Sequence, residues 1–353
     1  MGLSRTFTIA DYAQTGNQFC PLPSAKHQDG EAIVDWSHFG MDRPPFRPAV
    51  DAAAYFPAPA HSAALAALVA AFSRRDPLVL IDGAPGIGKS LVARKWLDDL
   101  LPDVPRVLLP NARAQTPVDL LQAILFDLNK PYQGLSEQEL RLAVTGHLLD
   151  AAAGGFPTVI VIDEAQHLST HALEELRLLG NLESRSGAVV FAVLVAQPAL
   201  RDALRKPVNA PIAGRISVRC SIDALSVEES AAYLRHQVRA ANGDPAKVFD
   251  EGTVELLASA CRGVPRVLNR AAALAFELAS EGETELVDVE AALEALERIG
   301  ITPPDEDGTS DAVLLPHPGR ESEPEARAKR KPTVTERSAG RGAKDKAVRK
   351  RPA

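Results

Sequence analysis

The sequence predicts an α/β fold, a three-layer arrangement with a parallel sheet between helices, followed by a small all-helical domain. Short apolar runs alternate with longer helical patterns up to about residue 224. Near-continuous apolar runs are typical of strands that are buried on both faces of a parallel sheet. After about Leu225 the strand pattern stops and only helical patterns follow. Strand–helix alternation followed by helices alone predicts an α/β domain followed by a helical domain.

Individual elements follow from local patterns. Strands are expected at the four apolar runs, 78–81, 106–109, 158–162 and 189–195. Helices are expected between and after them, at 91–101, 117–128, 137–152, 250–261, 265–280 and 287–299. Ser226 followed by Glu229 forms a capping box, which predicts a helix from there to about Ala241.

The predicted domain limits follow these elements. We expect an N-terminal extension over 1–38, an α/β core over 39–224, a helical domain over 225–300 and a disordered tail over 301–353. The tail is basic from residue 320, because 320–353 contains 12 Lys and Arg against 5 Asp and Glu. This balance of +7 leaves −14 on residues 1–319 of a chain whose net charge is −7. Segments with so few large apolar residues cannot offset their ordering entropy.

The composition excludes several classes of protein. With 353 residues, 46% of them hydrophobic, the chain can form a substantial core, so wholesale disorder is excluded. Its longest purely apolar stretch, 187–196, is far shorter than the roughly 20 residues of a membrane-spanning helix. We therefore expect a soluble, cytoplasmic protein without a membrane segment. Cys20, Cys220 and Cys261 form no C-x-x-C pair, which excludes a disulfide framework and a zinc knuckle.

A phosphate-binding loop is the strongest motif. Residues 83–90 match G-x-x-x-x-G-K-S between a predicted strand and a predicted helix, the context that gives this motif its meaning. Glycines let backbone N–H groups turn inward around phosphate, and the helix dipole adds attraction for the anion. Lys89 is expected to reach the β- and γ-phosphates and Ser90 to bind Mg²⁺. The predicted nucleotide-binding residues are Gly83, Ala84, Pro85, Gly86, Ile87, Gly88, Lys89 and Ser90.

Two acidic residues follow the buried strand at 158–162. Asp163 at the strand end is expected to hold the Mg²⁺ ion, and Glu164 to orient and activate the attacking water. Parallel α/β sheets place their ligands at the carboxyl ends of the strands, where both motifs fall. The sequence therefore predicts ATP and Mg²⁺ as the bound molecules and hydrolysis as the reaction.

Two further polar residues stand where such a site needs them. Gln197 follows the strand at 189–195 and is expected to bond the γ-phosphate or the water. Arg266 lies in the first turn of a helix of the helical domain. We expect it to sense the γ-phosphate and to couple its loss to movement of that domain.

Together these residues resemble an AAA+ ATPase, a P-loop NTPase, and more narrowly the ExeA/GspA family of the general secretion pathway. The closer resemblance is carried by residues 39–46, 55–56, 61, 163–168, 173–183, 195–200 and 263–269. It implies an α/β ATPase core, a helical lid domain and nucleotide-dependent homo-oligomers. Such oligomers complete each site with an arginine of the neighbouring subunit. Arg215 best matches that position, and Arg201, Arg205 and Arg219 remain alternatives.

The sequence is compatible with three functions. The resemblance implies an ATPase that assembles or remodels a protein partner. The alternative is a DNA-binding regulator similar to the transposition ATPases TniB, TnsC and MuB, and a third is a switch that binds ATP and rarely hydrolyses it. The basic tail 320–353 favours DNA through counterion release, whereas the acidic remainder of the chain argues against a large DNA-binding face.

Overall fold

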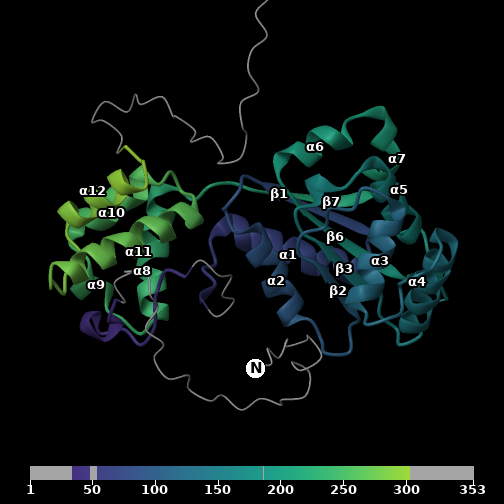
Figure 1. Cartoon of the computed structure of the whole chain (residues 1–353), viewed down its shortest axis with the longest axis horizontal. Coiled ribbons are helices and arrows are strands. Elements are labelled where there is room, and N and C mark those ends of the chain that lie inside the picture. The colour runs from purple at the N-terminus through teal and green to yellow at the C-terminus, as the bar shows by residue number, and fades with distance from the viewer. Residues whose placement is uncertain (1–33, 48–53, 186, 303–353) are drawn as a thin grey trace, which may run out of the picture. The chain divides into compact units, whose positions relative to one another are not determined.

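The computed structural model describes residues 34–47, 54–185 and 187–302 (Figure 1). Most of the predicted N-terminal extension, the tail from residue 303 and Cys20 lie outside these described residues. No helix within them combines the length and the apolar character that crossing a bilayer requires.

A sheet of five parallel strands forms the centre of the α/β part, in the order β2-β3-β6-β1-β7. The strands are β1 (Leu78–Gly83), β2 (Arg106–Leu109), β3 (Thr158–Ile162), β6 (Val190–Ala196) and β7 (Ile216–Ile222). The first four confirm the expected apolar runs, and β1, β3 and β6 are buried along their whole length. Strand β7 was not predicted. It lies at the edge of the sheet and is only partly buried, so its residues alternate between apolar and polar.

Helices cover both faces of this sheet, which confirms the three-layer prediction (Figure 1). Alternate strand residues point to opposite faces. On one face Val79 and Ile81 pack with helices α1 and α2, and on the other Leu78 and Leu80 pack with the remaining helices. These helices are α1 (Pro59–Arg74), α2 (Lys89–Asp99), α3 (Pro117–Asp127), α4 (Glu137–Ala152), α5 (Thr170–Leu179), α6 (Pro198–Leu204) and α7 (Ala210–Ala213). A two-stranded hairpin, β4 (Glu183–Ser184) and β5 (Gly187–Ala188), precedes β6.

Only helices follow β7 in the described residues. They are α8 (Val227–Ala240), α9 (Pro245–Val248), α10 (Glu251–Ala260), α11 (Pro265–Glu281) and α12 (Val289–Arg298). The capping box is present at the start of α8, where the Ser226 hydroxyl accepts from the Glu229 N–H at 3.1 Å. The Glu229 carboxylate in turn accepts from the Ser226 N–H at 2.9 Å.

The segment 34–46 packs against these helices and not against the sheet. Phe39 and Phe46 contact the ring of Phe276 on α11, with ring centroids 4.9 and 5.9 Å apart. Met41 belongs to the same buried cluster. The domain limit predicted at residue 39 therefore does not coincide with a change of hydrophobic core, since this segment shares its core with the C-terminal helices.

Candidate nucleotide site at the carboxyl edge of the sheet

The phosphate-binding loop connects β1 to α2, as the motif requires. Gly83 packs so tightly that a Cβ atom would lie 2.3 Å from the Ile222 carbonyl oxygen of β7. Gly88 has φ of +98° and faces His61, whose Nε2 would lie 2.9 Å from an added Cβ. Both positions therefore require glycine. The Lys89 side chain is buried, 7% exposed, and its Nζ donates to the Ala84 carbonyl at 2.8 Å.

His61 on α1 packs against this loop and holds it by a hydrogen bond. Its Nε2 lies 2.7 Å from the Ile87 carbonyl oxygen, which accepts a hydrogen bond from the ring N–H. Nδ1 is also buried, and it has no hydrogen-bond partner among the described residues. Burial lowers the pKa of His61, against the opposing effects of the Ile87 carbonyl and of Glu229. A neutral imidazole therefore fixes one side of the loop.

The two acidic residues follow β3 directly. The Asp163 N–H donates to the Leu109 carbonyl of β2 at 2.9 Å, and the Asp163 carboxylate accepts from the Glu164 N–H at 2.9 Å. Glu164 has φ of +54°, a left-handed conformation that non-glycine residues seldom adopt. This turn brings the Glu164 carboxylate toward Gln197, whose Nε2 donates to Glu164 Oε2 at 3.3 Å.

Strand register explains why Gln197 reaches the site. Asp82 of β1 pairs with Ala196 of β6, so Gln197 leaves the sheet at the level of Gly83, the first loop residue. A further glutamine, Gln166, lies between the two strand ends. Its Nε2 donates to Glu164 Oε2 and its Oε1 accepts from the Gln197 N–H at 3.0 Å.

The charge of Lys89 is set by this environment. Burial lowers the pKa of Lys89, while the nearby carboxylates of Glu164, Asp163 and Asp82 oppose that effect and the positive charge of Arg266 adds to it. These charges act on one ammonium group, so the two motifs are close in space as well as at the same edge of the sheet. A buried cation beside several carboxylates has the electrostatic character of a phosphate and metal site.

Arg266 reaches the phosphate-binding loop through its backbone. Its N–H donates to the Gly86 carbonyl at 3.2 Å, and a Cβ atom on Gly86 would lie 2.9 Å from the Arg266 Cβ. The arginine side chain is exposed beside the loop. Gly86 thus needs its φ of +81° and its missing side chain to admit the start of α11.

Three of the four candidate arginines make contacts within the chain. Arg201 binds the buried carboxylate of Asp82 through two of its nitrogens. One of them also donates to the Ser221 hydroxyl at 2.7 Å. Arg205 pairs with Asp202 on the surface at 3.0 Å. Arg219 donates to the Ala213 carbonyl at 3.0 Å.

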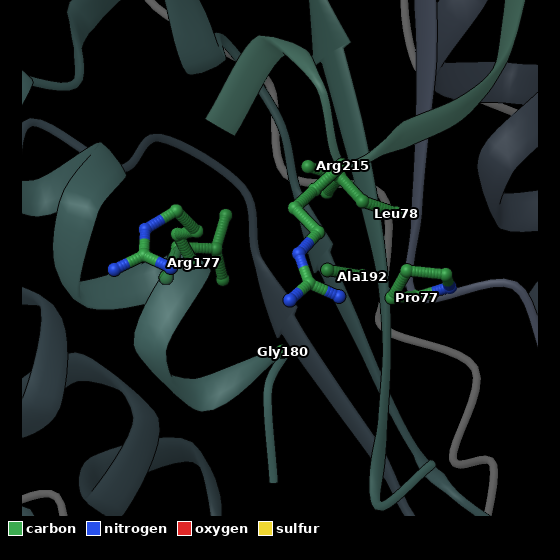
Figure 2. Close-up of a pocket in the computed structure, with 7 residues that line it drawn as sticks. Pro77, Leu78, Arg177, Gly180, Ala192 and Arg215 are labelled. Atoms are coloured by element: carbon green, nitrogen blue, oxygen red, sulfur yellow. The ribbon is translucent and has the colours of Figure 1, made fainter. Parts of the chain in front are cut away.

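Arg215 lies at the amino-terminal ends of the parallel strands, whereas the phosphate-binding loop lies at their carboxyl ends. It precedes Ile216, which pairs with Leu78 at the start of β1, whereas Ile222 pairs with Gly83 at its end. Six residues of strand span roughly 20 Å. Arg215 lines a shallow pocket with Pro77, Leu78, Leu176, Arg177, Gly180 and Ala192. Figure 2 shows its side chain extended beside Ala192 and Pro77, across the pocket from Arg177. It is therefore placed away from the loop of its own chain.

The residues at the loop fit a nucleotide with Mg²⁺. Ser90 and Asp163 offer hydroxyl and carboxylate oxygens, the donors that Mg²⁺ prefers. In the described parts of the chain no three His, Cys, Asp or Glu side chains gather into a metal-binding group. A Mg²⁺ ion bound here would take oxygen ligands from Ser90 and Asp163, and this ion usually completes its coordination with substrate phosphates and water.

Sequence reasoning assigned no role at this site to His61, Asp82 or Gln166, although His61 and Gln166 are among the residues that carry the family resemblance. Asp82 carried a detectable signal, since a carboxylate inside an apolar strand needs a partner to be buried. Gln166 stands two residues after Glu164, close enough to be noticed. The contact of His61 with the loop had no local signal, because it depends on how α1 packs against the loop.

Several known proteins are similar to this chain in sequence. Residues 73–204 match the AAA domain family. General secretion pathway protein A of Aeromonas hydrophila is 32% identical over 284 residues, which cover 78% of this chain and 50% of that protein. ATP-dependent target DNA activator B of Escherichia phage D108 is 25% identical over 226 residues, 61% of this chain and 64% of that protein. This chain thus matches about half to just under two thirds of these relatives' length.

The fold has solved counterparts. The ORC2 protein of Aeropyrum pernix, in its ADPNP and ADP complexes, superposes with a TM-score of 0.58 over 72% of this chain and 71% of that one. Sequence identity is 18%, so the likeness concerns the fold. The motif, the strand order and the family match lead to one assignment. The chain contains an AAA domain over residues 73–204, and over most of its length it is similar to general secretion pathway protein A.

Proposed function

We propose that this chain binds ATP with Mg²⁺ and hydrolyses it at the edge of the sheet where Lys89, Asp163 and Glu164 meet. The observation that carries the proposal is geometric: the phosphate-binding loop follows β1 and the Asp163–Glu164 pair follows β3 in one parallel sheet, and Gln197, which follows the strand between them, contacts Glu164. Lys89 binds the β- and γ-phosphates, and the Gly83–Ser90 backbone N–H groups line the phosphates. Ser90 and Asp163 hold Mg²⁺, which when bound neutralises charge on the phosphate oxygens.

Glu164 acts as the general base in this proposal. It orients the water that attacks the γ-phosphorus and takes up its proton as the bond to the β-phosphate oxygen breaks. Gln197, which contacts Glu164, bonds the γ-phosphate or the water. Arg266, beside Gly86, responds to loss of the γ-phosphate and transmits it to the C-terminal helices.

Arg215 acts on the site of a neighbouring copy. Its position at the far edge of the sheet and its exposed guanidinium support action in trans, because it cannot reach its own loop. Charge developing on the transferred phosphoryl group is stabilised by such an arginine. The ATP-dependent homo-oligomer that results assembles or remodels a partner complex, as the similarity to general secretion pathway protein A suggests.

Steady-state ATP hydrolysis of three proteins tests the catalytic part. We expect Glu164→Gln to keep ATP affinity but to lose turnover by about 100-fold or more, since the base is replaced by a neutral amide. Lys89→Ala is expected to lose nucleotide binding. Undiminished turnover in Glu164→Gln would refute the proposed base.

DNA binding is the second candidate function. Two phage relatives carry the name ATP-dependent target DNA activator B, and residues 320–353 have a balance of +7. If this function holds, ATP-bound protein retains duplex DNA, affinity falls steeply with rising salt, and removal of 320–353 weakens it. Equal and negligible retention by both proteins at low salt would exclude it.

A further inference from the structure

We propose that Gln166 is a positioning residue, which holds the carboxylate of Glu164 and ties it to the end of β6 at Gln197. This inference rests on the proposed function of Glu164 as the general base. It adds a residue that contacts neither the phosphate-binding loop nor Mg²⁺, but acts through the base.

Three hydrogen bonds define the arrangement. The Gln166 amide donates through Nε2 to Glu164 Oε2 and accepts through Oε1 from the Gln197 backbone N–H at 3.0 Å. The Gln197 side chain donates to the same Glu164 oxygen at 3.3 Å. One carboxylate oxygen thus receives two amide donors, one from Gln166 and one from Gln197, and the third hydrogen bond joins these two residues to each other.

The chemistry of the primary amide explains the choice of residue. A glutamine offers a donor and an acceptor on one planar group, so it can bind a carboxylate and a backbone N–H at the same time. Glutamate at 166 offers only acceptors when ionised, and leucine offers neither. Hydrogen bonds to an ionised acceptor are stronger than neutral ones, so this contact restrains Glu164 effectively.

The backbone makes such restraint necessary. Glu164 occupies the left-handed region and begins a single 3-10 turn, Ala165–His167, where no regular helix or strand fixes its side chain. Catalysis by a general base depends on its placement, and a displacement of about 1 Å can lower a rate by roughly 100-fold. Gln166 therefore determines the rate of hydrolysis, and Lys89 and the loop determine nucleotide affinity.

Gln115 supplies a matched control, because it supports the same turn without touching the base. Its Nε2 donates to the His167 carbonyl at 3.0 Å. Gln115→Leu removes a hydrogen bond from the turn but leaves those of Gln166 in place. If Gln166 did no more than stabilise the turn, Gln115→Leu would lower kcat as much as Gln166→Leu does.

The experiment compares full-length wild type, Gln166→Leu, Gln166→Glu, Gln115→Leu and Glu164→Gln. For each, kcat and KM for ATP hydrolysis, the Kd for a non-hydrolysable ATP analogue and the thermal unfolding midpoint are measured. We expect kcat to fall about 10- to 100-fold in both Gln166 variants, with Kd changed less than about twofold. Gln115→Leu is expected to keep kcat within about twofold.

Two results overturn the inference. Unchanged kcat in both Gln166 variants, with an active wild type and an inactive Glu164→Gln, contradicts the positioning role alone. A loss of kcat in Gln115→Leu equal to that in Gln166→Leu, with equal lowering of the unfolding midpoint, assigns the effect to the turn and also contradicts it. A wild type without hydrolysis refutes the proposed function, and the inference with it.

Discussion

Arg201 in the last turn of α6 binds the carboxylate of Asp82, the last residue of β1 before the phosphate-binding loop. Asp82 is 2% exposed and Arg201 is 39% exposed, so a buried anion is neutralised by a cation that still reaches water. The Ser221 hydroxyl of β7 completes the group by donating to Asp82 at 2.8 Å. Arg201, on α6, thereby joins β1 and β7 through contacts within its own chain.

Removal of Arg201 should destabilise the fold. Arg201→Ala leaves Asp82 buried without its partner, which we expect to lower the free energy of unfolding by about 3 kcal/mol. Arg205→Ala is the control, since its pair with Asp202 is exposed on both sides and should contribute less than about 1 kcal/mol. Urea unfolding of the two variants measures both values. Equal, small losses would contradict the structural role of Arg201.

The close packing of Gly83 predicts a second effect. Gly83→Ala places a methyl group against the Ile222 carbonyl and the Ile87 side chain, each 2.3 Å from the new Cβ. We expect a loss of about 2 kcal/mol of stability from overpacking, together with weaker nucleotide binding because the loop shifts. Gly146→Ala in the middle of α4 meets open space and should stabilise by about 0.5–1 kcal/mol. Urea unfolding and nucleotide titration of both variants provide the test.

Burial of His61 predicts a dependence of stability on pH. The pKa of His61 is lowered in the folded state, so below about pH 6.5 the unfolded chain binds a proton that the folded chain does not. The stability contribution is therefore complete above that pH and is lost as the pH falls toward the folded pKa. His61→Gln, which can still donate to Ile87, should reduce the loss of stability between pH 7.5 and pH 5.5.

His171→Gln on α5 serves as the control for this measurement, because His171 is exposed. Urea unfolding of the wild type and both variants at the two pH values gives one difference in stability for each of the three proteins. An identical pH dependence in wild type and His61→Gln would show that His61 is not the group responsible.

Arg215 predicts complementation between two inactive proteins. Arg215→Ala should keep nucleotide affinity but lose hydrolysis by about 1,000-fold, since the neighbour's site lacks its cation. Mixed with Glu164→Gln, it should regain activity, because the Glu164→Gln subunit supplies Arg215 to an intact site. Arg205→Ala, a nearby exposed arginine variant, should retain wild-type activity. A mixture no more active than the sum of its parts would contradict action in trans.

The sequence was sufficient for the central strands and for the loop. Strands β1, β3 and β6 are buried on both faces, so their apolar runs carry the signal without reference to the rest of the fold. The loop is fixed by local backbone requirements, which the glycines at 83, 86 and 88 satisfy within a few residues. Strand β7 escaped prediction because an edge strand with one covered face has a weaker, alternating pattern.

The contacts beneath and beside the loop depend on tertiary packing. Asp82 and Arg201 are separated by 119 residues, and no local pattern relates them. The clustering of Phe39 and Phe46 with Phe276 likewise joins segments far apart in the chain. Gln166 was close to the acidic motif, but its function depends on the position of Gln197, which the sheet register decides.

Analysis of the bound nucleotide tests the central claim, that Glu164 drives hydrolysis at a site held by Lys89. Each protein is incubated with ATP and Mg²⁺, freed of unbound nucleotide, and its bound nucleotide is identified. The account predicts ADP on the wild type, ATP on Glu164→Gln and no nucleotide on Lys89→Ala. ADP on Glu164→Gln, in the proportion found on the wild type, would contradict it.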